Sequence, residues 1–270
     1  MEDLYEWLEF LRISLSSSFL VLSSFYDLKA REVPNLIWIL FGPLGFALSF
    51  LQFLLTKDNT FLVFWLFSFL LTTGLSLALF YLGFFGGADA KALICLAVAL
   101  PVYPSLSDPH LNVLMPLFPL SVFSNAVLGS SLPVFAITSY NFSRLIQTRG
   151  RLFEGLEREP LWNKTLAFII GYKVDLDKLR KGSHHIPLEY FSRGEDGETV
   201  RHLRISPRLD EETITKDYHL NDSYKEMGGK IWVTPGLPFL VFVTAGFLAS
   251  LFIGDMITWL TVGLVSGKSI

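Results

Sequence analysis

The uneven distribution of charge along the chain most constrains how it can fold. Of its 47 Asp, Glu, Lys and Arg residues, 31 lie from Arg144 to Lys230, and the other 183 residues carry only 16. Segments with so little charge belong in lipid or in a very large dry core. We therefore expect a membrane domain with one polar insertion. Residues 1–143 and 231–270 form the membrane helices and tail in this interpretation, and 144–230 form the insertion.

The apolar runs predict how many helices cross the membrane. A spanning helix needs about 20 mostly apolar residues, and five charge-free runs approach or exceed that length. The first segment is weaker because it is rich in serine, but serine hydroxyls can bond to their own helix backbone. The run at residues 111–143 contains three prolines, so it should kink or include a re-entrant piece. We predict a mainly α-helical, polytopic protein with six transmembrane helices, at residues 8–26, 33–56, 59–88, 92–107, 111–143 and 231–254.

The insertion between the fifth and sixth helices has the composition of a small α+β module. Residues 166–174, 186–191 and 199–205 are rich in residues that favour strands, and residues 193–197 are typical of a turn. We expect a meandering sheet with a short helix near residues 151–157.

The positions of Lys and Arg predict which side of the membrane each loop occupies, because basic loops remain in the cytoplasm. Lys29 and Arg31 follow the first predicted helix, Lys91 follows the third and the insertion follows the fifth. The opposite loops carry almost no basic residues. We therefore predict a protein of the cell membrane with a cytoplasmic insertion and both termini outside.

Acids embedded in apolar sequence are costly and usually mark function. Asp27 ends the first predicted helix and Asp89 starts the fourth, so both should lie near the cytoplasmic end of their helices. Two close carboxylates share a proton. The ionised member can then take a proton from water while the neutral member donates one to a scissile carbonyl oxygen. The pair predicts aspartyl peptide hydrolysis, with no cofactor. Asp255 should lie on the outer side as a structural or snorkelling acid.

Each acid also has a simpler interpretation. Asp27 could belong to an ordinary charged loop, and Asp89 could serve only as the N-terminal charge of a helix. The alternative function is a proton- or cation-coupled transporter that uses Asp27, Asp89 and Asp255 as a relay. It predicts acids at several depths and broken helices in paired halves. A non-catalytic assembly protein on the same scaffold is a third interpretation.

Two motifs resemble those of a known family. Residues 27–35 resemble the first catalytic motif of the type IV prepilin peptidases, an Asp followed by basic residues and an Ile/Val-Pro-Asn, here Val33, Pro34 and Asn35. Residues 234–239 resemble the start of the last helix in the archaeal branch. The second catalytic motif, Gly-x-Gly-Asp, is matched by Gly86, Gly87, Ala88 and Asp89, with Ala88 in place of the second glycine.

The chain is thus similar to archaeal preflagellin and prepilin peptidases, which are GxGD-type aspartyl proteases. The resemblance implies that Asp27 and Asp89 are catalytic, and that class III signal peptides of preflagellin or prepilin precursors are cut at the cytoplasmic membrane face. Such precursors and the lipid bilayer are the implied partners. The lone Cys95 excludes the paired Cys-x-x-Cys segment of the bifunctional bacterial members, which also N-methylate their products.

The remaining polar residues receive supporting roles. The small residues before Asp89 would let a substrate backbone approach closely, and Lys29, Arg31 and Lys91 would anchor at lipid headgroups. Charge alone makes three acids of the insertion candidates for binding a basic leader: Glu195, Asp196 and Glu198. Four histidines of the insertion lack a metal-binding spacing, and nothing indicates a nucleic-acid partner: His184, His185, His202 and His219.

Overall fold

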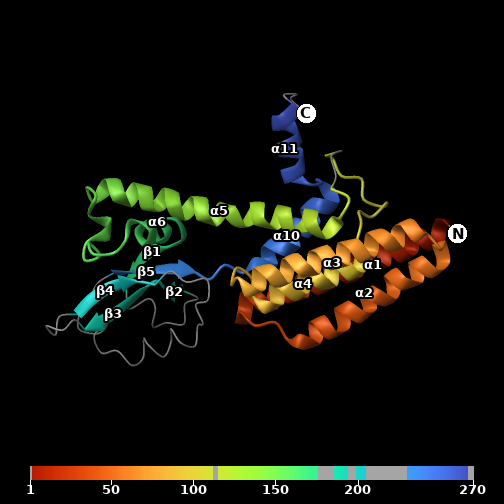
Figure 1. The fold of residues 1–270 in the computed structure, drawn as a ribbon, viewed down its shortest axis with the longest axis horizontal. Helices are drawn as coiled ribbons and strands as arrows, with labels where there is room; N and C mark the ends of the chain where they lie inside the picture. Colours follow the sequence, from red (N-terminus) through yellow and green to blue (C-terminus); the bar gives the residue numbers. More distant parts are fainter. Residues whose placement is uncertain (1, 112–114, 176–184, 194–198, 205–229, 267–270) are drawn as a thin grey trace. The chain divides into compact units, whose positions relative to one another are not determined.

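The computed structural model describes residues 2–111, 115–175, 185–193, 199–204 and 230–266 (Figure 1). The chain forms two compact units. The first, called the helical unit, comprises Met1–Ser130 and Pro238–Ile270, and its described elements are helices. The second, called the mixed unit, comprises Ser131–Leu237 and combines helices with strands.

Long apolar helices dominate the helical unit. In Figure 1, α1 to α4 run side by side, and α11 bends away from the end of α10. Four helices, α1, α2, α3 and α5, are long and apolar enough to cross a membrane, and α10 with α11 forms a fifth candidate with a 61° bend. The elements are α1 (Glu2–Ala30), α2 (Asn35–Thr56), α3 (Asn59–Tyr81), α4 (Gly87–Ala99), α5 (Phe118–Gln147), α10 (Phe239–Phe252) and α11 (Met256–Ser266).

The predicted mainly α-helical membrane architecture is confirmed, with four to five candidate spans. The short helix α4 accounts for the difference from the six predicted. It has 13 residues, about 20 Å of helix, whereas the hydrocarbon core of a bilayer is about 30 Å thick.

Glycine and capping residues decide where α2 and α3 end. α2 stops at Lys57, whose φ of 51° is left-handed, and Asp58 then caps α3 by accepting a 2.8 Å hydrogen bond from the Thr60 backbone N–H. α3 ends at Tyr81, two residues before Gly83, which has a φ of 83°. The predicted boundaries 59–88 and 92–107 are therefore wrong. Apolar content alone does not reveal the glycine turn between α3 and α4, and α4 ends at Ala99, two residues before Pro101. The predicted 111–143 helix starts only at Phe118, but it continues through Pro133 without a re-entrant piece.

Helix α4 is packed closely against its neighbours through small residues. A Cβ added to Gly45 of α2 would lie 2.7 Å from the Cβ of Ala99. The Ser49 hydroxyl donates to the carbonyl oxygens of Val98 at 2.9 Å and Ala99 at 3.0 Å, and the Trp65 indole N–H donates to Val98 at 3.0 Å. These bonds satisfy carbonyl groups that the end of a helix leaves without backbone partners. The C-terminal end of α4 is thus held by side chains of both α2 and α3.

The core of the helical unit draws residues from α1, α2, α4, α5 and α10. Cys95 is buried within it, as expected for a packing residue. α10 approaches α5 so closely that a Cβ on Gly246 would lie 2.5 Å from the Val122 carbonyl oxygen and 2.8 Å from the Ala126 nitrogen. Glycine at this position therefore sets the distance between the two helix backbones.

Asp255 is a buried structural acid. It is completely inaccessible to solvent. Its carboxylate accepts hydrogen bonds from the hydroxyls of Ser121 at 3.0 Å and Ser124 at 3.3 Å, and from the Thr258 backbone N–H at 2.9 Å. The structural interpretation of Asp255 is correct, and the snorkelling interpretation is wrong, because its charge is satisfied inside the protein.

The mixed unit contains a three-stranded antiparallel sheet of order β1-β5-β2 and a separate β3–β4 hairpin. The buried Glu189 carboxylate joins the two, since it accepts 2.9 and 2.6 Å bonds from Arg201 and a 2.8 Å bond from the Trp232 backbone N–H. Besides the end of α5, the elements are η1 (Arg151–Phe153), α6 (Leu161–Ile170), β1 (Tyr172–Asp175), β2 (His185–Pro187), β3 (Glu189–Arg193), β4 (Thr199–Leu203) and β5 (Lys230–Pro235).

The expected α+β content of the insertion is confirmed, but several boundaries differ. The predicted strand at 166–174 is wrong in its first half, because Pro160 starts helix α6 and the chain becomes extended only after Gly171. The sheet is not a simple meander, since its central strand β5 comes last in the sequence. β5 also occupies the start of the predicted 231–254 helix, where Pro235 and Pro238 delay α10. The predicted turn at 193–197 falls largely outside the described residues.

We expect Gly246→Ala to destabilise the protein, because the new methyl group would press on the backbone of α5. Overpacking of this kind costs roughly 1–3 kcal/mol. The control is Gly74→Ala in α3, where a Cβ would meet nothing within 4 Å and the better helix former should stabilise by up to about 1 kcal/mol. Thermal unfolding of both purified variants measures the difference, and equal melting temperatures would contradict close α5–α10 packing.

Candidate active site

Asp27 lies in the last turn of α1, beside the first turn of α10. Its side chain is partly buried, and its Oδ2 atom has no hydrogen-bond partner among the described residues. The Leu240 backbone N–H lies within hydrogen-bonding range of the carboxylate, and the Arg31 guanidinium is close enough to act on its charge. A helix N-terminus carries partial positive charge. Asp27 therefore has one polar neighbour on α10 and one oxygen left available.

Asp89 occupies the first turn of α4. Its Oδ2 atom accepts a 3.0 Å hydrogen bond from the Gly86 backbone N–H. A Cβ on Gly86 would lie 3.1 Å from that oxygen, so a larger residue would crowd the carboxylate. Gly86 has an ordinary φ of −72°, which means that glycine serves here for space. Asp89 is therefore a charge at the start of a helix, as the simpler interpretation predicted. That interpretation does not explain the nearby Asp27 carboxylate.

The two acids lie close enough for their charges to interact, although Asp27 and Asp89 are far apart in sequence. They belong to helices that contact each other within the helical unit. The surroundings are largely apolar, with Tyr26, Ala88 and Phe239 packed against the buried core. Two carboxylates in such surroundings repel when both are ionised, so they favour a state that holds one proton between them. The arrangement has the elements of an acid–base pair.

A direct hydrogen bond joins the two sequence motifs. The Lys91 ammonium, two residues after Asp89, donates to the Asn35 side-chain oxygen at 2.7 Å. Asn35 begins α2 directly after its N-cap, Pro34. The side chains predicted to surround the acids are therefore partly brought together by the fold.

The two basic residues of the first motif lie at the C-terminal end of α1. Lys29 is exposed, with its ammonium 5.8 Å from the centre of the Phe25 ring. Arg31 adopts a left-handed φ of 57°, and its N–H donates to the Asp27 carbonyl oxygen at 3.1 Å. This conformation ends α1 one turn after Asp27 and turns the chain toward α2.

A hydroxyl pair that the sequence analysis missed fastens α1 to α10 one turn from Asp27. The Ser24 hydroxyl lies 2.9 Å from the Leu240 carbonyl oxygen and 2.7 Å from the Thr244 hydroxyl. Thr244 lies in turn 3.1 Å from the Leu20 carbonyl oxygen. Sequence reasoning counted Ser24 only as one of many serines in α1. The spacing of three residues between Ser24 and Asp27 was a usable signal, since it places both on one helix face.

Comparison with known proteins identifies the family. A sequence model of the type IV leader peptidase family matches residues 14–134, and a model of the archaeal peptidase A24 C-terminus, type II, matches residues 163–256. An uncharacterised protein of Methanocaldococcus jannaschii is 30% identical over 230 residues, which are 85% of this chain and 70% of that protein. The chain belongs to the type IV leader peptidase family. The resemblance inferred from the two motifs is confirmed, and both acids lie in the first matched region.

Two relatives of this peptidase have names that state an activity. A preflagellin peptidase of Methanococcus voltae is 27% identical over 243 residues, which cover 88% of this chain and 93% of the relative. A preflagellin peptidase of Methanocaldococcus jannaschii is 25% identical over 244 residues, 88% of this chain and 92% of the relative. Together with the apolar helices, these likenesses make the chain a multi-pass membrane peptidase.

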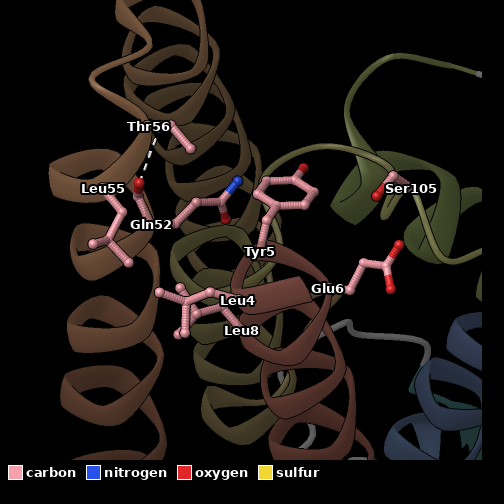
Figure 2. A pocket seen from close by; sticks show the side chains of 8 residues that line it. All are labelled: Leu4, Tyr5, Glu6, Leu8, Gln52, Leu55, Thr56 and Ser105. Carbon is pink, nitrogen blue, oxygen red and sulfur yellow. Dashed lines mark hydrogen bonds between the residues drawn. The ribbon is translucent and has the colours of Figure 1, made fainter. Parts of the chain in front are cut away.

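A pocket of about 520 Å³ lies at the opposite end of α1 from Asp27 (Figure 2). Tyr5 and Asp27 are separated by about 33 Å of helix, so this pocket is not the peptidase site. Gln52 and Tyr5 point toward each other there, and Glu6 points away. The pocket is lined by Leu4, Tyr5, Glu6, Leu8, Gln52, Leu55, Thr56 and Ser105.

A buried ion pair lies at the same end of α1. Glu9 and Arg12 are each 2% exposed and lie 3.7 Å apart. Glu9 also accepts a 2.6 Å bond from the Ser105 hydroxyl and a 2.9 Å bond from the Leu106 backbone N–H. Arg12 therefore lies beside an opposite charge inside the protein.

The residues predicted for leader binding, Glu195, Asp196 and Glu198, lie outside the described residues, as do His184 and His219. His202 bonds to Glu159 at 3.0 Å and His185 to Tyr172 at 2.6 Å, both within the mixed unit. Across the described ranges, no group of three His, Cys, Asp or Glu side chains could hold a metal ion.

We expect Ser24 and Thr244 to be energetically coupled, because each hydroxyl loses a partner when the other is removed. Unfolding of Ser24→Ala, Thr244→Val and the double variant in bicelles should give a coupling energy of about 0.5–1.5 kcal/mol. The matched control is Ser18→Ala on the same helix. Ser18 is exposed, and among the described residues its hydroxyl bonds within α1, to the Ser14 carbonyl oxygen at 2.8 Å. Additive effects of Ser24→Ala and Thr244→Val would contradict the fastening of α1 to α10.

Proposed function

We propose that this peptidase is a membrane-embedded aspartyl endopeptidase with Asp27 and Asp89 as its catalytic pair. The observation that carries the proposal is the approach of two carboxyl groups from separate helix ends in a largely apolar setting. The names of the preflagellin peptidase relatives support the substrate class. The proposed reaction is removal of class III signal peptides from preflagellins or type IV prepilin-like precursors at the cytoplasmic membrane face.

The chemistry follows from one proton shared between the two acids. The ionised carboxylate takes a proton from a water molecule, which attacks the scissile carbonyl carbon. The neutral carboxylic acid donates its proton to the carbonyl oxygen as the tetrahedral intermediate forms. The intermediate then collapses, the C–N bond breaks and the leaving amine receives a proton. The titration belongs to the pair, so the mechanism assigns the proton to neither Asp27 nor Asp89 alone.

The residues around each acid favour this hydrolysis. Gly86 leaves space beside the Asp89 carboxylate, so an extended substrate backbone can come close. The substrate must be extended because a helix shields its own amides. The Arg31 guanidinium and the Leu240 backbone N–H both lie beside the Asp27 carboxylate, where they can orient it. Lys91 and Asn35 hold the ends of α4 and α2 together beside the acids.

The proposed topology has six membrane segments, with α4 and the chain that follows it completing the fourth. The basic residues Lys29, Arg31 and Lys91 then lie on the cytoplasmic side with the acids, and both termini lie outside. Lys29 and Arg31 at this boundary would meet lipid headgroups. The apolar part of the substrate would enter sideways between helices, with its cleavage site at the acids.

The alternative of a proton- or cation-coupled transporter requires Asp255 as the third acid of its relay, and Asp255 does not fit that role. Asp255 lies roughly 20 Å along α10 from the Asp27 region, and its carboxylate is fully occupied by hydrogen bonds from Ser121, Ser124 and Thr258. A relay would need acids that exchange protons in turn. The family likeness supports a peptidase and offers no support for transport.

Asp27→Asn and Asp89→Asn should each lower cleavage roughly 100-fold or more, since removing one acid–base group abolishes the shared proton. The assay uses purified full-length protein with a preflagellin that carries its leader, and the shorter product is followed on a gel. Asp58→Asn is the matched control, because asparagine can still cap α3. Full activity of either variant at position 27 or 89 would disprove the assignment, and parallel reactions with a prepilin would define substrate preference.

The cleavage rate should pass through a maximum with pH. At low pH both acids are protonated and no base remains, whereas at high pH both are ionised and no acid remains. Initial rates over a pH series, with the folded fraction checked at each pH, measure the profile. A rate that only rises or only falls over the range of stable folding would argue against a shared proton.

A further inference from the structure

The N-terminal tip of α6 exposes large apolar side chains on the mixed unit. Leu161 is 81% exposed and Trp162 is 70% exposed, the highest values among the large apolar side chains described in this unit. The other end of the helix is packed, since Ala167 is buried and Phe168 and Ile170 lie against the core around it. The α6 tip, defined here as Leu161, Trp162 and Thr165, is therefore a surface feature on a firmly held helix.

Hydrogen bonds attach α6 to the last turns of α5. The Asn141 side-chain amide donates to the carbonyl oxygens of Phe168 at 2.7 Å and Gly171 at 2.5 Å. The Thr138 hydroxyl lies 3.4 Å from the Ile169 carbonyl oxygen. Because α5 is a candidate membrane span, these bonds hold α6 near the level at which the span ends.

The last turns of α5 expose three large apolar side chains. Tyr140 is 51% exposed, Phe142 58% and Ile146 65%. Large apolar side chains are stable in contact with lipid, and Trp and Tyr are enriched where hydrocarbon meets headgroups. These side chains belong to the part of α5 that lies in the mixed unit, which also carries the α6 tip.

The charge of this segment favours anionic lipid. Between residues 144 and 164 the chain has five basic and three acidic residues. One of those acids is already engaged, because Glu159 bonds to His202 at 3.0 Å and to Asn163 at 3.0 Å. Burial tends to raise the pKa of Glu159, but these hydrogen bonds outweigh it and the pKa lies below its usual value. Arg151 and Arg158 are exposed and free to meet headgroup phosphates.

We propose that the α6 tip inserts into the headgroup region of an anionic membrane leaflet and anchors the mixed unit to the membrane surface. Leu161 and Trp162 supply the apolar contact, and neighbouring arginines supply the attraction to phosphate. At this depth Trp162 would lie where hydrocarbon meets headgroups, the region in which Trp is enriched. The proposal needs only that α5 spans the membrane, and it does not depend on the catalytic role of Asp27 or Asp89.

The test places a nitroxide spin label at the α6 tip of the full-length protein in lipid nanodiscs. Thr165→Cys carries the label, because Thr165 is exposed on the same helix end. Cys95 is buried and can be replaced with alanine or left unlabelled. The control label is Asp175→Cys, an exposed site at the end of β1. Collision with oxygen, which concentrates in lipid, is compared with collision with a neutral nickel chelate, which stays in water.

We expect the oxygen-to-nickel collision ratio at residue 165 to exceed that at residue 175 by about threefold or more in discs of phosphatidylglycerol. Leu161→Ser with Trp162→Ser should bring the two ratios together. Arg151→Gln with Arg158→Gln should weaken the difference, and so should replacement of phosphatidylglycerol with a zwitterionic lipid. Circular dichroism and melting temperature confirm that each variant is folded.

Two results would overturn the proposal. Equal ratios at residues 165 and 175 in anionic discs would mean that the α6 tip remains in water. Protection of residue 165 only after addition of a leader-bearing preflagellin would mean that the surface binds protein instead of lipid. Cleavage activity, measured in the same discs, separates this outcome from failure of the catalytic assignment, because the tip variants leave Asp27 and Asp89 unchanged.

Discussion

The hydrogen-bonding needs of the short helix α4 organise the helical unit. A helix end buried in an apolar setting must find partners for its carbonyl groups, and Ser49 of α2 and Trp65 of α3 provide them. Small side chains along α4 then allow its neighbours to approach. The opposite end begins at Gly86, where the same requirement for N–H partners is met in part by Asp89 itself. The packing that holds the C-terminal end of α4 therefore also fixes the position of Asp89 at its N-terminal end.

Asp27 depends on a second helix end in the same way. The Ser24 and Thr244 hydroxyls hold α1 against α10, and this contact brings the Leu240 N–H to the Asp27 carboxylate. Pro238 starts α10 at the level where α1 ends. The two acids are thus presented by the ends of three helices. Side chains held in this way lose little freedom when a substrate binds, which favours the orientation that proton transfer requires.

Much of this arrangement could be predicted from particular residues. The position of acids in apolar sequence indicated Asp27 and Asp89, and the charge distribution indicated the membrane helices and the polar insertion. Helix boundaries were harder to predict, because the apolar run after residue 59 contains a glycine turn that ends α3. Residues 166–170 were predicted as the start of a strand, but they belong to helix α6. The Lys91–Asn35 and Ser24–Thr244 contacts join residues more than 50 positions apart. Contacts between such distant residues cannot be predicted from the local sequence.

The sequence by itself indicated a membrane protein, because 183 of its residues carry only 16 charges and its charge-free runs approach or exceed the length of a membrane span. It also determined which acids stand out and which family their motifs resemble. Only the tertiary structure decided that α4 is too short to span alone, that Asp255 is satisfied internally and that β5 lies at the centre of its sheet. These outcomes depend on which hydrogen-bonding groups and small residues meet across distant segments. Such meetings are fixed by packing of the whole chain and not by the character of any one segment.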